Sequence, residues 1–231
     1  VTVSETRTFG PISWQIESGQ KWFIAGRNGS GKSVLLELIE RGGRVLAGAA
    51  SGIPQDVVVV SDAAHLALID RERHKYDGPD DKLEGTSVAD LLTELKPVDT
   101  VLTELIRRFQ LQPLLRQRFR QLSTGETKKV LFVRALASEC SMLMLDEPLA
   151  GLDAASQAVA LGSLADFVGG KTVLLVFNDW AALPDWVDHV AYLSDSRLAY
   201  QGPMKPAAAR SWLHQMVVLT NDAQALPTPL P

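Results

Sequence analysis

Residues 26–33 have the residue types and spacing of a loop that binds phosphate groups. Their sequence fits the pattern G-x-x-x-x-G-K-S. Glycines at these positions let successive backbone N–H groups converge on a phosphate, and the helix that follows points its positive end at the same anion. We expect Lys32 to neutralise the β- and γ-phosphates of a nucleoside triphosphate, and the Ser33 hydroxyl to bind Mg²⁺. The full predicted loop is Gly26, Arg27, Asn28, Gly29, Ser30, Gly31, Lys32 and Ser33.

A pair of carboxylates, Asp146 and Glu147, ends the apolar segment Met142–Leu145. In a parallel sheet, residues at the carboxyl end of a strand beside a phosphate loop face the ligand crevice. We therefore expect Asp146 to hold Mg²⁺, directly or through a water molecule. Glu147 comes one residue later, where it could polarise an attacking water as a general base. The acidic pair and the phosphate loop together predict a site that hydrolyses a nucleotide.

The segment Leu122–Glu126, with the sequence LSTGE, has a structural and a functional interpretation, and the two are compatible. Ser123 and Glu126 have the spacing of a capping box at the start of a helix over Thr127–Ala137. The same helix start presents N–H groups, and Gly125 permits close approach, so the segment can also bind a phosphate. Its position between the phosphate loop and the acidic pair favours adding the functional role to the structural one.

Short apolar runs that alternate with helical patterns must position these residues. Helical spacing of leucines predicts a helix from Lys32 to about Arg41, and a helical pattern covers Ser87–Ala137. The polar segment 70–86 is expected to be a solvated connector or an insertion that meets a partner. This alternation predicts an α/β fold with a mostly parallel sheet, helices on both faces and an inserted helical lobe. The predicted strands are Val1–Phe9, Ile12–Ile16, Lys21–Ala25, Val57–Val60, Met142–Leu145 and Val173–Phe177.

The composition narrows the class of protein. The 231 residues are 46% hydrophobic and 22% charged, which is ordinary for a globular protein with a sizeable core. A net charge of −4 argues against nucleic-acid binding, which usually comes with a basic excess. The single cysteine, Cys140, cannot form an internal disulfide, and no apolar run approaches the roughly 20 residues of a membrane span. We expect a cytoplasmic protein, either in solution or peripheral on the cytoplasmic face of the inner membrane.

The phosphate loop, LSTGE, LMLDEP and the following GLD together resemble the nucleotide-binding domain of ABC ATPases. The resemblance extends from about Val1 to Trp212 and implies a P-loop NTPase (RecA-like) core. It also implies an N-terminal antiparallel β part and a helical subdomain, about 65–138, inserted in that core. More narrowly, LSTGETKK, DEPLAGLD and VLLVFNDWAALPDW resemble the first half of the molybdate-operon tandem ABC ATPases, the ModF or photorepair-protein PhrA type. We expect an ABC domain over 1–220 and a Pro-rich linker over 221–231, leading to a second such domain.

The resemblance also implies a partner, because ABC domains bind ATP and Mg²⁺ between two domains stacked head to tail. Ser123 and Gly125 are then expected to contact the γ-phosphate of the nucleotide held by the opposite domain. Asp153 is expected to lie along the interface between the domains. The second ABC domain is either part of the same longer chain or a second copy. A membrane subunit docked on residues 65–115 is expected for a transporter motor, and none for a soluble tandem ATPase.

The chain departs from the ABC pattern at two positions. Within 177–179, Asn178 takes the place of the histidine usual in this family, so the predicted catalytic set is Glu147, Lys32 and Asn178. An amide can donate a hydrogen bond to a γ-phosphate but cannot shuttle a proton, which predicts slow hydrolysis; capping of a turn is the alternative role. The glutamine expected after Val57–Val60 is also missing, and Asp62 or Ala64 takes its place. A nucleotide-gated binding scaffold or regulatory ATPase with little hydrolysis is therefore the alternative function.

The aromatic residue that stacks on adenine in ABC domains has no clear counterpart. Phe9 and Trp14 are the candidates, although Trp14 also fits a position in the core. This gap leaves the prediction of ATP binding unchanged, because that prediction depends on the phosphate loop.

Overall fold

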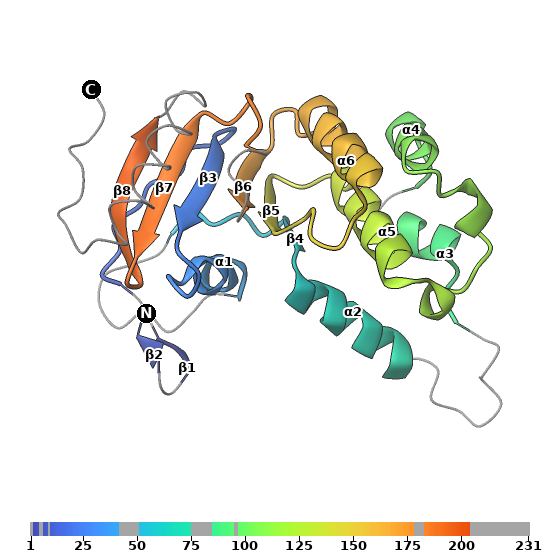
Figure 1. Cartoon of the computed structure of the whole chain (residues 1–231), viewed down its shortest axis with the longest axis horizontal. Coiled ribbons are helices and arrows are strands. Elements are labelled where there is room, and N and C mark those ends of the chain that lie inside the picture. The colour runs from blue at the N-terminus through green and yellow to red at the C-terminus, as the bar shows by residue number, and fades with distance from the viewer. Residues whose placement is uncertain are drawn as a thin grey trace. The chain divides into compact units, whose positions relative to one another are not determined.

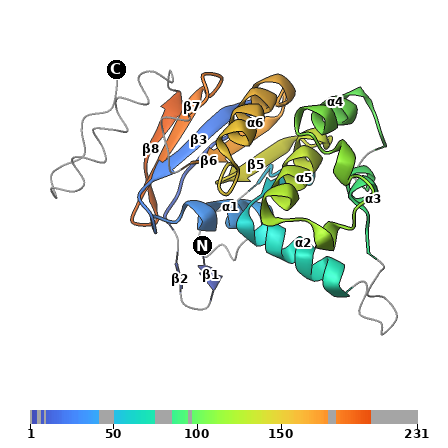
Figure 2. The same ribbon diagram turned by 45° about the vertical axis from the view of Figure 1, so that its right-hand side comes forward.

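The computed structural model describes residues 2–4, 7–8, 10–41, 51–74, 85–94, 97–177 and 183–203 (Figures 1 and 2). The chain divides into two compact units. The first comprises Val1–Val57, Ser141–Glu147 and Gly170–Pro231, and the second comprises Val58–Cys140 and Pro148–Gly169. The phosphate loop and the acidic pair belong to the first unit, whereas LSTGE and Asp153 belong to the second.

The sheet of the first unit has the strands β3 (Lys21–Gly26), β5 (Met142–Asp146), β6 (Thr172–Val176), β7 (His189–Ser194) and β8 (Arg197–Pro203). They lie in the order β5-β6-β3-β7-β8 (Figure 1). β5, β6, β3 and β7 are parallel, and β8 is antiparallel to β7. A separate antiparallel pair is formed by β1 (Thr2–Ser4) and β2 (Arg7–Thr8). The predicted α/β fold, with a mostly parallel sheet and an N-terminal antiparallel part, is confirmed.

The central strands of this sheet are buried along their whole length. Every residue of β3 and of β6 is buried, and Phe23 and Leu175 are completely inaccessible. A parallel strand with both faces covered needs a nearly continuous apolar run rather than an alternating pattern, which is what the sequence has at these strands. Helix α1 (Lys32–Arg41) follows the phosphate loop and packs against β3 and β5.

The N-terminal segment differs from the prediction. The single strand predicted at Val1–Phe9 is two short strands, and the strand predicted at Ile12–Ile16 is wrong, because this segment is irregular. Its burial does alternate, with Ile12, Trp14 and Ile16 half-buried between exposed neighbours. The Ser13 carbonyl in this segment accepts a hydrogen bond from the Gln201 side chain at 2.8 Å and not from the backbone of a neighbouring strand. Alternating hydrophobicity therefore reports the burial of this segment and not strand pairing.

The second unit is helical. Its helices are α2 (Asp62–His74), α3 (Val88–Thr93), α4 (Thr100–Arg108), α5 (Thr124–Ala137) and α6 (Ala154–Phe167), with 3-10 turns at Gln112–Leu114 and Phe119–Gln121. The strand β4 (Val57–Val60) leads into this unit. α5 packs against α3, α4 and α6, and the Arg108 guanidinium lies 5.1 Å from the Phe167 ring centroid. The bounds of about 65–138 for an inserted subdomain stay a prediction.

Helix α2 extends further than the sequence predicts. Residues 70–74, expected to begin a polar connector, form its last turn, while 75–84 lie outside the described residues. Ser61 starts the helix: its hydroxyl accepts the N–H of Ala64 at 3.0 Å. Arg71 near its end is paired, because it bonds to Glu94 at 3.0 Å and contacts the buried Glu72. Paired charges let a polar segment stay helical, which polarity alone does not indicate.

Within the described ranges, no helix has the length and apolar character needed to cross a bilayer. The predicted linker at 221–231 lies outside the described residues, as does the rest of the chain after residue 203.

Replacement of Leu145 by Ala tests whether the buried strand before the acidic pair anchors the first unit. Leu145 is completely buried, so Leu145→Ala should lower the free energy of unfolding by about 2–5 kcal/mol. Ile53→Ala is the control, because Ile53 is 40% exposed, and it should cost less than about 1 kcal/mol. Urea unfolding followed by tryptophan fluorescence reports on this unit, since all 5 tryptophans of the chain fall within its ranges. Equal losses in the two variants would contradict this account of the core.

Candidate functional site

The phosphate loop and the acidic pair meet at one edge of the sheet in the first unit. β6 lies between β3 and β5 and is parallel to both. In this register Leu175 is paired with Phe23 on one side and with Leu145 on the other. β3 and β5 therefore end at the same edge. Gly26, the last residue of β3, leads into the loop, and Asp146, the last residue of β5, is the first residue of the acidic pair. This is the edge at which open α/β sheets bind their ligands.

Gly26 makes the sharp exit from β3 that the loop requires. Its φ is +155°, and a Cβ there would lie 2.5 Å from both the Leu193 carbonyl oxygen and the Ser30 hydroxyl. Those distances are too short for any real contact, so a side chain at position 26 would displace the loop. The Ser30 hydroxyl is itself buried and has no hydrogen-bond partner among the described residues. The backbone next to it is fixed, because the Ser30 carbonyl accepts the N–H of Ser196 at 3.2 Å.

The Lys32 side chain folds back into the loop that precedes it. Its Nζ donates to the Gly26 carbonyl at 2.9 Å and to the Arg27 carbonyl at 3.2 Å, and the residue is only 7% exposed. Burial lowers the pKa of Lys32 from 10.5, while the negative charges of Glu147 and Asp146 oppose that shift. The Lys32 ammonium is therefore close enough to interact electrostatically with both carboxylates of the acidic pair.

Glu147 has an unusual backbone conformation directly after β5. Its φ is +49°, in the left-handed region that residues other than glycine rarely adopt. The backbone N–H of Glu147 donates to the Val176 carbonyl at 3.0 Å, which holds this turn against β6. Strained conformations of this kind tend to occur at functional sites, where the surrounding structure maintains them. The turn keeps both carboxylates at the edge where Lys32 lies.

The residues at this edge have the chemistry that a phosphate and a magnesium ion require. An ammonium has three donors, and the described carbonyls account for two of those of Lys32. Ser33 is exposed at the start of α1, where a helix favours an anion. No group of three His, Cys, Asp or Glu side chains able to hold a metal occurs in the described residues. Mg²⁺ typically takes one or two protein ligands together with phosphates and water, so Ser33 and Asp146 fit that pattern.

In the second unit, Ser123 and Glu126 form the predicted capping box at the start of α5. The Ser123 hydroxyl accepts the N–H of Glu126 at 3.3 Å, and the Glu126 carboxylate accepts the N–H of Ser123 at 2.8 Å. The Ser123 hydroxyl also donates to the Glu126 carboxylate at 2.7 Å, and this bond, together with the one from the Ser123 N–H, lowers the pKa of Glu126. Asp153 caps α6 in a similar way, accepting from the N–H and hydroxyl of Ser156 at 2.9 and 2.7 Å, which lowers its pKa. The roles of Ser123, Gly125 and Asp153 toward a nucleotide stay predictions.

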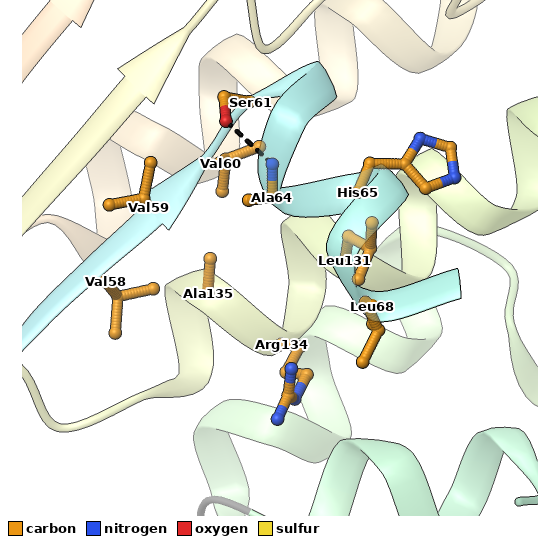
Figure 3. Close-up of a pocket in the computed structure, with 10 residues that line it drawn as sticks. All are labelled: Val58, Val59, Val60, Ser61, Ala64, His65, Leu68, Leu131, Arg134 and Ala135. Carbon is orange, nitrogen blue, oxygen red and sulfur yellow. Dashed lines mark hydrogen bonds between the residues drawn. The ribbon is translucent and has the colours of Figure 1, made fainter. Parts of the chain in front are cut away.

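The positions that the sequence left open differ in the structure. Asn178 and Phe9 lie outside the described residues. The Trp14 ring meets the Trp22 ring edge-on at 5.0 Å between centroids, a packing contact on β3 that fits a core position. Asp62 is the first residue of α2, while Ala64 belongs to the lining of a pocket of about 90 Å³ together with apolar side chains, His65 and Arg134 (Figure 3). The choice between Asp62 and Ala64 stays open.

Lys128 of the second unit was not predicted from the sequence. Its Nζ donates to the Ala150 carbonyl at 2.8 Å and to the Asp62 carboxylate at 3.1 Å. The available signal was its place in LSTGETKK, two residues after the capping box. A lysine near a helix start is common, so its contacts could be found only in the structure.

Comparison with known proteins identifies related sequences and folds. The family described as ABC transporter matches residues 9–150. The ABC transporter ATP-binding protein ModF of Escherichia coli (strain K12) is 31% identical over 220 residues, covering 93% of this chain and 45% of ModF. The molybdate import ATP-binding protein MolC of Haemophilus influenzae (strain ATCC 51907 / DSM 11121 / KW20 / Rd) is 29% identical over 178 residues, covering 76% of this chain and 67% of MolC. The chain thus spans less than half the length of ModF.

A solved structure described as the ATP binding subunit of an ABC transporter has the same fold. It matches with a TM-score of 0.68 at 20% sequence identity, over 90% of this chain and 91% of that one. At this level of identity the match supports the fold alone, and the chemistry is inferred from the residues of this chain.

Titration of two buried lysines tests the electrostatics of the site. Glu147→Gln should lower the pKa of Lys32 further, because it removes the leading charge that opposes the effect of burial. Asp188→Asn is the matched control: Asp188 acts in the same way on Lys21, so this change should lower the pKa of Lys21 instead. Lysine side-chain NMR over an alkaline titration measures both values. A Lys32 pKa that ignores Glu147→Gln would contradict the geometry of the site.

The same shift makes the stability of the first unit depend on alkaline pH. The folded chain releases the Lys32 proton at a lower pH than the unfolded chain, whose lysine titrates near 10.5. Between these two values the unfolded state binds more protons, so the stability contributed by this group rises with pH. Replacing Lys32 by Met should remove that rise from the free energy of unfolding, measured in steps of alkaline pH up to 10.5.

Proposed function

Since the chain belongs to the ABC transporter family, we propose that its phosphate loop and acidic pair bind one MgATP and that a pair of such domains hydrolyses it. The single observation that carries this proposal is the Lys32 ammonium, buried against the loop carbonyls and within reach of Asp146 and Glu147. A buried cation at the start of a helix is suited to bind a phosphate group.

Each residue of the first unit has a distinct role in this proposal. Lys32 neutralises the β- and γ-phosphates, and the N–H groups of the loop bind the β-phosphate. Ser33 and Asp146 would hold Mg²⁺, which shields the phosphate charge when it is bound. Glu147 accepts a proton from the attacking water, and its turn after β5 keeps its carboxylate near Lys32. The remaining loop residues position the backbone.

The second unit completes the site of a partner domain in this proposal. Ser123 and Gly125 lie at the start of α5, whose capping box leaves the helix N-terminus able to face a γ-phosphate. Asp153 lies at the start of α6, exposed enough to meet a partner surface, with 64% of its side chain accessible. A lone domain then binds ATP but hydrolyses it poorly, because half of each site belongs to the other domain.

The likeness to ModF and MolC guides the proposed setting. MolC is named for molybdate import, so we place this chain in the ATP-binding component of a molybdate-type transport system or in a tandem ABC ATPase without a membrane subunit. In either case its proposed place is the cytoplasm, free or on the inner face of the membrane. Copurification of a membrane subunit with the full-length protein would favour the first setting.

Two substitutions in the first unit test ATP binding and hydrolysis separately. Lys32→Ala should abolish measurable MgATP binding, whereas Glu147→Gln should keep binding and lower hydrolysis by about 100-fold or more, the usual effect of losing a general base. Glu37→Gln, a like change at an exposed position of α1, should keep both activities. Calorimetry with MgATP and phosphate release at high protein concentration measure the two quantities.

Three results would contradict this part of the proposal. They are full binding by Lys32→Ala, full hydrolysis by Glu147→Gln, and equal hydrolysis per chain in dilute monomer and in concentrated, paired protein. Binding with no hydrolysis in the wild-type pair would instead favour the alternative, a nucleotide-gated scaffold.

We also propose that hydrolysis is slow, because Asn178 stands where most members of the family have a histidine. A histidine at this position can exchange a proton near the γ-phosphate, and an amide cannot. Asn178→His should therefore raise the single-turnover rate by about tenfold, a modest part of the usual effect of an acid–base group. An unchanged rate in rapid-quench experiments would assign Asn178 to capping of a turn.

A further inference from the structure

The turn Leu149–Leu152 in the second unit is held by side chains from two helices. It is closed by a hydrogen bond from the Leu152 N–H to the Leu149 carbonyl at 3.2 Å. Gln157 of α6 donates to the carbonyls of Leu149 and Leu152 at 3.3 and 3.1 Å. Lys128 of α5 donates to the Ala150 carbonyl at 2.8 Å. Because Asp153 follows directly, these bonds also fix where α6 begins.

Lys128 packs against the turn as well as bonding to it. A Cβ on Gly151 would lie 3.3 Å from Lys128 Nζ and 3.6 Å from its Cδ and Cε atoms. Gly151 has a φ of +77°, so a glycine there serves both the turn and the close approach of the lysine. The Gly151 carbonyl oxygen lies 4.0 Å from the position that a Cβ on Gly125 would occupy. The turn and the first turn of α5 are therefore in close contact.

The same ammonium reaches the start of a third helix. Lys128 Nζ lies 3.1 Å from the Asp62 carboxylate, where α2 begins. The Lys128 side chain is 19% exposed and that of Asp62 is 79% exposed, so this ion pair is largely solvated and weak. The bond to the Ala150 carbonyl is shorter, at 2.8 Å, and a charged donor strengthens it. The shorter contact of Lys128 is thus with the turn.

We propose that Lys128 is a positioning residue: it holds the turn Leu149–Leu152, and with it Asp153, in place against the start of α5. This inference rests on the proposed function, in which Ser123, Gly125 and Asp153 act together at the interface with a second domain. Residues that must meet one partner surface need a fixed spacing, and small displacements of such groups lower turnover strongly. Lys128 supplies that spacing from within one unit.

The adjacent lysine offers a matched control. Lys129 lies on the same helix, and its Nζ is 3.7 Å from the Asp153 carboxylate, an ion pair without the short bond to a turn carbonyl. Lys129→Met and Lys128→Met remove the same charge one residue apart. Met keeps the unbranched apolar stem of lysine, so Lys128→Met preserves the packing on Gly151 and removes the donor. Lys128→Arg keeps both charge and donor.

Hydrogen exchange of the 231-residue chain, measured by mass spectrometry without nucleotide, tests whether Lys128 holds the turn. Lys128→Met should speed exchange in peptides covering residues 149–153 by about fivefold or more, because the turn opens more often. Lys129→Met should change it by less than about twofold, and Lys128→Arg should restore most of the protection. Equal exchange in the two Met variants would overturn the inference.

Steady-state hydrolysis at concentrations where the domains pair tests the consequence for turnover. Lys128→Met should lower kcat about tenfold while KM for ATP changes by less than about twofold, because the phosphate loop is untouched. Lys128→Arg should recover most of the lost kcat, and the melting temperatures of the two Met variants should agree. An unchanged kcat in Lys128→Met, or a loss matched by Lys129→Met, would overturn the positioning role. Absence of hydrolysis in the wild-type chain would contradict the proposed function, while the exchange experiment would still decide whether Lys128 holds the turn.

Discussion

The buried ammonium of Lys32 is the constraint on which the first unit depends. A lysine removed from water must be hydrogen-bonded and faced by negative charge, or it loses its proton. The carbonyls of Gly26 and Arg27 supply the bonds, and Asp146 and Glu147 supply the charge. The loop carbonyls and the left-handed turn at Glu147 are the local features that meet this requirement. A phosphate oxygen is a stronger partner than a carbonyl, so the arrangement that satisfies Lys32 also prepares the loop for an anion.

The second unit solves a different problem, which is to present helix starts at fixed places. The Ser123 hydroxyl and the Asp153 carboxylate accept N–H groups in the first turns of α5 and α6. In both cases the partner residue is three positions further along the chain. Such caps define where each helix begins but not how the two helix starts are spaced. The turn between β5 and α6, held by Gln157 and Lys128, provides that spacing. The first unit therefore holds the buried charge of Lys32, and the second unit fixes the spacing between the starts of α5 and α6.

The sequence predicted the parts of the fold that have a periodic or sharply spaced signal. The phosphate loop, the buried strands β3, β5 and β6, and α1 were predictable because glycines at this spacing and continuous apolar runs are compatible with few alternative structures. The buried strand β7 was not predicted. Ile12–Ile16 was mistaken for a strand because burial alternates there without a backbone ladder. The end of α2 was missed because its polar sequence does not reveal that Arg71 pairs with Glu94. The left-handed conformation of Glu147 and the contacts of Lys128 depend on atoms distant in the chain, so no local pattern reveals them.

The most direct test of the central claim is to ask whether one nucleotide lies against both stretches of the first unit. Titration of the labelled chain with MnATP, followed by NMR, would measure paramagnetic broadening of individual backbone amides. We expect the amides of Gly29, Ser33 and Asp146 to broaden together, to saturate together and to recover together when excess MgATP is added. Broadening at the loop without Asp146, or at neither, would show that the glycine-rich loop and the acidic pair do not share a ligand.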